Sequence, residues 1–215
     1  MIENFCTITP TRGGDRPALL ENCVNQIKRM GCRMNSYIIN YPPKSSAADL
    51  VPRVRHGIEL ARRDGFEYAF IIEDDDAYPP DYFSRFTPGY DFYGFDSTVY
   101  YNIRNRTFSG VDRHPNRASL FCTGFRIKAL DRFVWPPDDF IFLDIKLWEY
   151  ATLYHKRVQL IGGDNPCLGI KHNIGKVGGK GHKGQQRHTD PDFNWLRAHV
   201  EKDSFEFYKN LALRL

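Results

Sequence analysis

The sequence predicts an α/β fold with an open, mostly parallel sheet, flanking helices and a smaller antiparallel portion. In the first third of the chain, short apolar runs alternate with amphipathic segments, a pattern typical of parallel strands that helices cover on both faces. After Tyr90 the pattern becomes aromatic and alternating, as in antiparallel strands. A chain of 215 residues with 41% apolar residues is long enough to bury the core of one compact domain.

Three apolar strands are expected early in the chain, at residues 4–8, 35–41 and 67–72. A helix after the first strand begins with Asp15 as its cap and Pro17 in its first turn, and Gly31 ends it. A second helix covers residues 46–65, with Pro52 in its first turns, where proline is tolerated. This strand and helix order is the beginning of an open α/β sheet.

The second half is expected to be more irregular. Residues 91–110 alternate as antiparallel strands do, and residues 118–133 contain a strand, a glycine break and a short helical piece. A helix over 142–157 carries Asp144 near its start, and a strand follows at 158–163. Residues from 190 onward have the apolar spacing of a helical tail.

Composition argues against membrane and disulfide-rich classes. No stretch approaches the ~20 consecutive apolar residues that cross a bilayer, and the N-terminus lacks the pattern of a signal peptide. The cysteines are odd in number and form no CxxC pair, which favours reduced, buried thiols in a cytoplasmic protein over a zinc or disulfide framework. These residues are Cys6, Cys23, Cys32, Cys122 and Cys167.

Two polar stretches follow predicted strands, "TPTR" at 9–12 and "EDDD" at 73–76. Ligands of open α/β sheets bind beyond the carboxyl ends of the strands. Four adjacent acids repel one another, and a divalent cation would offset that repulsion. On an extended chain Asp74 and Asp76 point to one side, so we expect Asp76 as the direct ligand and Asp74 at the ribose or a metal-bound water. Asp75 is the alternative ligand if the chain turns, and a solvated acidic turn is the alternative to a site.

The net charge of +4 is concentrated late in the chain. Residues 146–188 contain eight Lys or Arg residues, four His and only two acids, which suggests a phosphate partner. Within the glycine-rich run 175–189, Lys180 and Lys183 are expected to contact a phosphate group, because glycines let backbone N–H groups approach it. The run is not a P-loop, since the GKS/T ending is absent. A solvated connector is the alternative.

Four stretches in order resemble glycosyltransferases of the GT-A type, closest to family 2. They are "TITPTRGGDRPALLENCVNQI", "IIEDDDAYPPDYF", "FCTGFRIKAL" and "FLDIKLWEYA", and the resemblance runs from about Phe5 to His172. It implies a GT-A-like domain over 1–189, with a nucleotide-binding half (about 1–90), an acceptor half (about 91–175), the basic loop and the tail 190–215. It also implies sugar transfer from a nucleotide-sugar donor, most often a UDP-sugar, with Mn²⁺ or Mg²⁺.

The resemblance implies roles for several residues. Thr9, Pro10, Thr11, Arg12 and Arg53 would contact the donor, with Asp74 and Asp75. Asp144 would be the general base of an inverting reaction, although Leu143 stands where the family has an acid. Asp139, with Asp138, is the reserve, and a helix cap is the alternative role of Asp144. His172 or His182 would be a further metal ligand.

The acceptor and the oligomeric state stay open. A glycan acceptor is expected, and hydroxymethylated bases in DNA are the minority possibility, because the late segment is basic and has aromatic residues nearby. One alternative activity is that of a sugar-phosphate nucleotidyltransferase, although Gly13 and Gly14 imitate its glycine-rich loop poorly. The other is a non-catalytic nucleic-acid-binding protein, which would leave the acidic run without a role.

Overall fold

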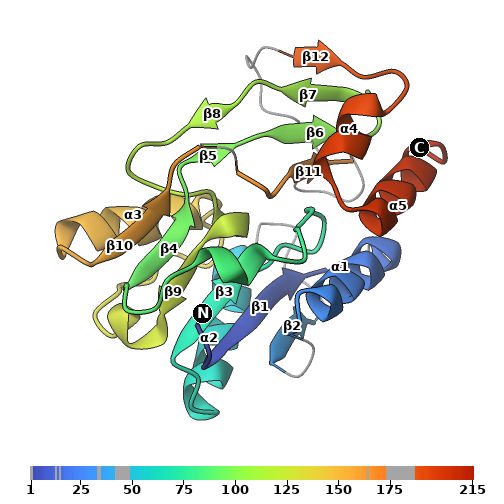
Figure 1. The fold of residues 1–215 in the computed structure, drawn as a ribbon. Coiled ribbons are helices and arrows are strands. Elements are labelled where there is room, and N and C mark those ends of the chain that lie inside the picture. The colour runs from blue at the N-terminus through green and yellow to red at the C-terminus, as the bar shows by residue number, and fades with distance from the viewer. Residues whose placement is uncertain are drawn as a thin grey trace.

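The computed structural model describes residues 2–12, 14, 16–32, 35–41, 49–163, 165–172 and 187–215. It contains a main sheet of six strands in the order β10-β4-β9-β3-β1-β2, a sheet of four in the order β11-β6-β7-β12, and a pair β5-β8. Figure 1 shows the smaller sheet standing above the main sheet, with helices α4 and α5 beside it.

The first half forms the parallel part of the main sheet, as the sequence predicts. Its elements are β1 (Phe5–Thr11), α1 (Pro17–Arg29), β2 (Ser36–Asn40), α2 (Leu50–Arg63) and β3 (Tyr68–Ile71). The central strand β1 pairs in parallel with both β2 and β3. It continues through Thr9, Pro10 and Thr11, which were expected to form a loop, and Pro10 lies beside Ile39 of β2.

The helices bury the faces that their apolar spacing predicts. Leu19, Cys23 and Ile27 are buried on α1, at the spacing of one helix face. Helix α2 lies close against β1, because a Cβ atom at Gly57 would come within 2.4 Å of Ile8 Cγ2. Only a glycine fits this approach.

The second half adds one antiparallel strand to the middle of the main sheet. Strand β9 (Gly124–Arg126) pairs antiparallel with β3 and with β4 (Phe92–Phe95), and β10 (Val158–Ile161) pairs in parallel with β4. The short helices η1 (Tyr82–Arg85), η2 (Leu120–Cys122) and η3 (Ile127–Leu130) and helix α3 (Leu143–Leu153) connect these strands.

The smaller sheet contains β6 (Tyr100–Asn102), β7 (Thr107–Ser109), β11 (Gly169–Lys171) and β12 (Arg187–Thr189). The pair β5 (Ser97–Thr98) and β8 (Asp112–Arg113) lies next to it in Figure 1. Strand β12 lies inside the run expected to be a loop, and its three residues are exposed, so they lack the apolar alternation that predicts strands.

The C-terminal helices α4 (Asn194–His199) and α5 (Lys202–Ala212) share a second apolar cluster with the smaller sheet and with α1. Leu19 of α1, Tyr101 of β6, Ile170 of β11 and Tyr208 of α5 belong to it. The helical tail therefore packs against the rest of the chain.

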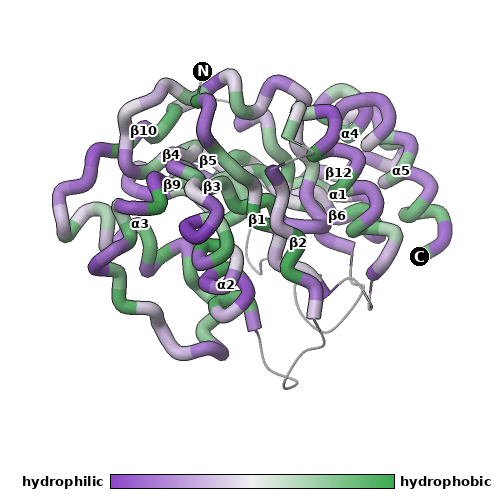
Figure 2. Tube along the Cα trace, turned by 90° about the horizontal axis from the view of Figure 1, so that it is seen from below, coloured by the Kyte–Doolittle hydropathy of each residue, from purple (hydrophilic) through white to green (hydrophobic). Residues whose placement is uncertain are grey.

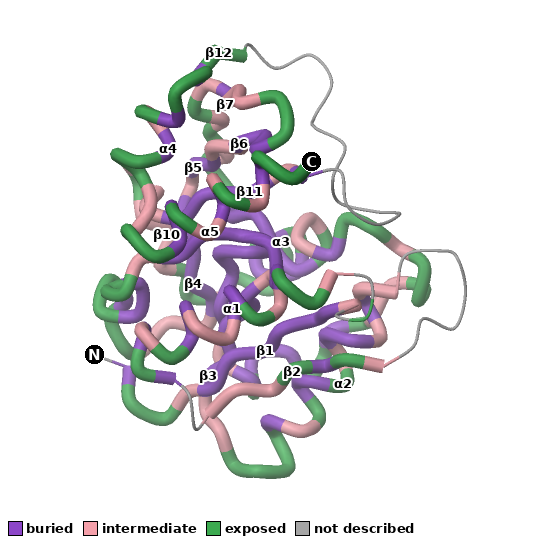
Figure 3. The backbone as a smooth tube through the Cα atoms, turned by 90° about the vertical axis from the view of Figure 1, so that its right-hand side faces the viewer, coloured by how far each residue is buried: buried purple, intermediate pink, exposed green. Residues whose placement is uncertain are grey.

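The main apolar core contains residues of β1, β3 and β4 and of the helices that pack against them. Figure 3 shows these three strands buried along most of their length. Aromatic rings gather around Phe70, whose ring lies within 6.3 Å of those of Tyr82, Phe83, Phe86 and Tyr93. Helix α2 shows apolar and polar residues in turn along its course in Figure 2. Within the described ranges, every helix is too short or too polar to cross a membrane.

Candidate active site

The run Glu73–Asp76, here called the acidic turn, follows β3 at the carboxyl edge of the main sheet, where β1, β2 and β3 end. The backbone of Ile72 still pairs with Ile8 of β1, and the chain then turns at Asp74 and Asp75 before Ala77 bridges to Leu168. The extended geometry expected for this run is therefore wrong. Because of the turn, Asp75 lies on the side where the alternation of side chains along an extended chain would have placed Asp74.

Three carboxylates of the acidic turn face a common point. One oxygen from each of Glu73, Asp75 and Asp76 lies within 4.8 Å of the others. Asp74 is directed elsewhere, because its Oδ2 accepts a hydrogen bond from Thr11 Oγ1 and its Oδ1 contacts Arg16 at 2.8 Å. Asp75, the alternative ligand of the sequence analysis, therefore lies with Asp76. Asp74 lies nearer to β1, on the side where the donor is predicted to bind.

Three side chains from elsewhere approach Asp75 and its neighbours. Arg16 Nη1 donates to Asp75 Oδ2 at 2.9 Å, and His172 Nε2 lies 3.0 Å from the same oxygen. His172, the predicted metal ligand, is fully buried, and its contact with Asp75 places it beside the acidic turn. The Lys171 ammonium, over the ring of Tyr100 at 4.8 Å, has a raised pKa: burial lowers it, but the charges of Asp76 and Asp75 outweigh that effect.

The backbone of the acidic turn is held by neutral groups. Gln26 of α1 donates to the Asp76 carbonyl at 2.9 Å and accepts from Tyr78 N–H at 2.8 Å. The hydroxyl of Tyr208 on α5 donates to the carbonyls of Asp75 and Asp76 at 3.1 and 2.9 Å. The Asp76 side chain accepts from the Ile170 N–H at 2.7 Å. The turn is therefore fixed from α1, α5 and β11.

Burial and mutual repulsion shift the pKa values of these acids in different directions. Burial and the charge of Asp75 raise the pKa of Glu73 to about 7 and that of Asp74 to about 6, and they raise the pKa of Asp76 well above its usual value. Burial also acts against ionised Asp75, but its hydrogen bond with His172 and the charge of Arg16 lower its pKa overall. Asp75 is the stable anion of the group.

These residues fit a hard divalent cation. The donor set consists of carboxylate oxygens, which Mg²⁺ and Mn²⁺ prefer. The four carboxylates of the turn face two permanent cations, Arg16 and Lys171, so full ionisation leaves two negative charges uncompensated. Burial, and after it the charge of Asp75, raises the pKa values of Glu73 and Asp76, and a bound divalent cation would favour their ionised forms.

The predicted donor residues at "TPTR" lie beside the acidic turn, with Thr11 bonded to Asp74. Arg12 pairs with Asp49 through its Nε at 3.0 Å. Arg53 is only 2% exposed, and its terminal nitrogens donate to the carbonyls of Thr11, Ile39 and Tyr41 and to Asp49. This guanidinium ties the ends of β1 and β2 together, and its contact with a donor stays a prediction.

The predicted base Asp144 lies in the first turn of α3, where Arg117 Nη1 contacts its Oδ2 at 2.7 Å. Burial raises the pKa of Asp144, and the charge of Arg117 opposes that shift. Asp144 is not the cap residue, a position held by Phe142. The reserve Asp139 is exposed, while its neighbour Asp138 pairs with Arg55 of α2 at 3.1 Å.

Three predicted residues, Lys180, Lys183 and His182, lie outside the described residues. Sequence reasoning missed Arg117, the partner of Asp144, and four residues that contact or surround the acidic turn, which are Arg16, Gln26, Lys171 and Tyr208. Only Arg16 carried a signal, as a cation directly before the proline that begins α1. The others come from segments whose proximity to the turn depends on the tertiary fold.

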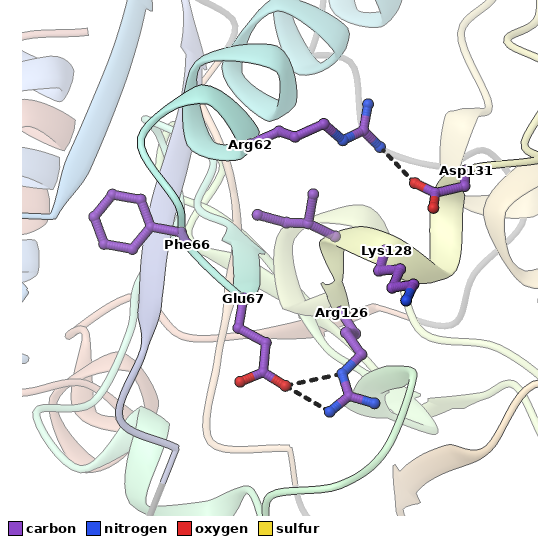
Figure 4. Close-up of a pocket in the computed structure, with 7 residues that line it drawn as sticks. Arg62, Phe66, Glu67, Arg126, Lys128 and Asp131 are labelled. Carbon is purple, nitrogen blue, oxygen red and sulfur yellow. Dashed lines mark hydrogen bonds and ion pairs between the residues drawn. The ribbon is translucent and has the colours of Figure 1, made fainter.

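A separate hollow of about 530 Å³ lies at the other edge of the main sheet (Figure 4). Two ion pairs line it, Arg62 with Asp131 at 3.1 Å and Arg126 with Glu67 at 2.5 Å. Acids pair with both arginines, and the hollow lies at the end of β3 opposite to the acidic turn, away from the edge where open α/β sheets bind ligands.

The sequence matches no protein-family model and no curated protein. The structure is similar to several solved proteins, two of which are described here. One is residues 1–349 of TarS from S. aureus, solved in complex with UDP-GlcNAc, with a TM-score of 0.51, 12% identity, and coverage of 98% of this chain and 72% of TarS 1–349. The other is the catalytic domain of Drosophila β1,4-galactosyltransferase 7, solved in complex with xylobiose, with a TM-score of 0.53, 13% identity, and coverage of 94% and 81%. These similarities confirm the predicted GT-A-like α/β fold.

Proposed function

We propose that this chain is a metal-dependent glycosyltransferase that moves a sugar from a nucleoside diphosphate donor to an acceptor hydroxyl with inversion. The observation that carries the proposal is the convergence of Glu73, Asp75 and Asp76 at the carboxyl edge of the sheet. That edge is where open α/β sheets bind ligands. The fold shared with a protein solved with UDP-GlcNAc and with a galactosyltransferase supports the same activity.

The donor is proposed to lie over β1 and the acidic turn. Thr9, Pro10, Thr11 and Arg12 would line the nucleoside side, with Asp74 directed toward the ribose. Glu73, Asp75 and Asp76 would hold Mn²⁺ or Mg²⁺, with His172 beside them. A bound divalent cation would neutralise the negative charge that grows on the departing diphosphate. A UDP-sugar is the donor we favour.

Asp144 is proposed as the general base, which removes the proton from the acceptor hydroxyl as that oxygen attacks the anomeric carbon. Its raised pKa makes the carboxylate a better proton acceptor, and its pairing with Arg117 holds the carboxylate in one orientation. Attack on the face opposite to the diphosphate inverts the anomeric configuration. We place the protein in the cytoplasm, and the five free, buried thiols support that location.

A glycan is the acceptor we favour, and the xylobiose bound to the Drosophila enzyme supports it. Hydroxymethylated DNA is the second acceptor, supported by a stack of rings on α4 and the smaller sheet. The ring of Trp195 lies 4.2 Å from that of Phe108 and 3.8 Å from that of His199, and His188 stacks on Phe108 at 5.1 Å. Aromatic rings with an open face accept nucleobases by stacking, and the two histidines of this stack are exposed.

The decisive assay incubates the protein with Mn²⁺ and a panel of nucleoside diphosphate sugars, with glycans or hydroxymethylated DNA as acceptors. We expect release of a nucleoside diphosphate that depends on the acceptor and stops with EDTA. Asp76→Asn should lower turnover by about 100-fold or more, because it removes one of the converging charges. Asp81→Asn is the matched control, since Asp81 is an exposed acid that pairs with Arg85.

Two outcomes would replace the proposal. Release of pyrophosphate from a nucleoside triphosphate would identify a sugar-phosphate nucleotidyltransferase. Salt-sensitive DNA binding that Asp76→Asn leaves unchanged, without turnover of any donor, would identify a nucleic-acid-binding protein.

A further inference from the structure

We propose that Arg16 is a built-in counter-cation of the acidic turn that competes with the divalent metal, so that metal binding requires its guanidinium to leave Asp75. This inference rests on the metal site of the proposed function. It concerns a residue of the chain that shares a carboxylate with that site.

The guanidinium of Arg16 bridges two neighbouring carboxylates. Its Nη2 lies 2.8 Å from Asp74 Oδ1 and its Nη1 lies 2.9 Å from Asp75 Oδ2. The exposed fractions of the side chains are 15% for Arg16, 1% for Asp74 and 8% for Asp75. Charge-assisted hydrogen bonds in such a dry environment are strong.

Asp75 belongs both to this bridge and to the group of converging carboxylates. Its Oδ2 contacts Arg16 at 2.9 Å and His172 at 3.0 Å, which uses both acceptor directions of that oxygen. A divalent ion held by Glu73, Asp75 and Asp76, whose ligand atoms lie within 4.8 Å, would therefore sit next to a fixed positive charge. Like charges at this range in a buried site repel strongly.

The contacts of Arg16 differ from those of Arg53 in what they support. Within the described residues, its polar contacts go to Asp74, Asp75 and His172. Arg53 differs, because it donates to three strand-end carbonyls as well as to an acid. If Arg16 lost its contact with Asp75, every strand end would keep its hydrogen bonds. Displacement of Arg16 by a metal would therefore cost less than displacement of Arg53.

The test is a calorimetric titration of the full chain with Mn²⁺ alone, without nucleotide. We expect Arg16→Gln to bind Mn²⁺ at least about tenfold more tightly than the wild type, since a competing positive charge is gone. Its melting temperature should fall in EDTA and rise with Mn²⁺ by more than that of the wild type. Arg29→Gln is the matched control at the other end of α1, where Arg29 pairs with Glu201, and its Mn²⁺ affinity should be unchanged.

Equal or weaker Mn²⁺ binding by Arg16→Gln would overturn the inference. If this variant is unfolded in EDTA, folding on addition of Mn²⁺ supports the inference, and an unfolded state under both conditions overturns it. The proposed function is judged separately. Turnover of a sugar nucleotide in EDTA would show glycosyl transfer that does not depend on a metal. Tight Mn²⁺ binding by Arg16→Gln without any turnover would preserve this inference alone.

Discussion

Single residues of the acidic turn differ in which protonation state the fold favours. Burial favours the neutral forms of Glu73, Asp74 and Asp76, whereas His172 and Arg16 favour the anion of Asp75. Neighbouring buried carboxylates repel one another when ionised, and a bound cation would reduce this repulsion. The sequence could predict the cluster, but not which acid stays ionised, because that depends on partners from distant segments.

Stability without metal should therefore fall as the pH rises. The pKa of Glu73 is raised to about 7 and that of Asp74 to about 6, by burial and by Asp75. Raised carboxyl pKa values contribute stability that is complete below the unfolded values of about 4 and is lost as the pH passes through 6 to 7. The check is the melting temperature in EDTA between about pH 4.5 and 7.5. In Mn²⁺ the decline should be reduced or reversed, because ionised acids bind metal.

Glu73→Gln combined with Asp74→Asn provides the control for this pH dependence. These substitutions remove two of the three acids of the turn whose pKa values are raised, so the EDTA profile should become flatter across the same range. A decline as steep as that of the wild type would assign the effect to other groups.

Among the elements, the strands and helices before residue 72 follow patterns that sequence reasoning can use. Apolar residues mark the buried positions in these elements. They form runs in β1, β2 and β3 and one face of α1 and of α2. Strand β9 has only three residues and β12 is exposed, so their pairing with distant strands decides their conformation. Such long-range pairing is not encoded in local periodicity.

The contact of α2 with β1 gives a prediction at the scale of elements. Gly57→Ala should destabilise the fold by about 1–2 kcal/mol, because overpacking outweighs the gain of about 1 kcal/mol in helix propensity. The new Cβ atom would lie 2.4 Å from Ile8 Cγ2. Urea unfolding measures the change. Gly110→Ala, where nothing lies within 4 Å, should change stability by less than about 0.5 kcal/mol, and equal effects would contradict the argument.

The start of α3 gives a second prediction, which chooses between two candidate bases. Asp144→Asn should lower kcat by about 100-fold or more, because the amide cannot accept the acceptor proton. The donor KM should change little, since Asp144 lies on α3 and not at "TPTR". Steady-state kinetics with the identified donor provide the measurement.

Asp139→Asn is the matched control for this choice, because Asp139 is exposed and is the reserve base. Activity close to wild type is expected. Loss of activity in Asp139→Asn together with an active Asp144→Asn would exchange the two assignments.

On the scale of the whole molecule, the candidate site depends on segments from both ends of the chain. Arg16 precedes α1, the acidic turn follows β3, Lys171 and His172 end β11, and Tyr208 lies on α5. Sequence reasoning pointed to the acidic turn and to His172, which the structure brings together, while Asp144 stays a predicted base. It could not locate the contacts of α5, because the tail is separated from the turn by more than a hundred residues.

Tyr208→Phe tests this dependence on the C-terminal helix. The hydroxyl donates to the carbonyls of Asp75 and Asp76, and its removal leaves both without that buried donor. A loss of about 1–3 kcal/mol in stability is expected, with weaker Mn²⁺ binding because the two ligands are less firmly oriented. Melting and Mn²⁺ titration of the variant measure both effects. Tyr154→Phe removes the hydroxyl of a tyrosine that is 48% exposed and should change neither. If Tyr208→Phe lowers stability but leaves Mn²⁺ affinity intact, α5 stabilises the fold without orienting the ligands.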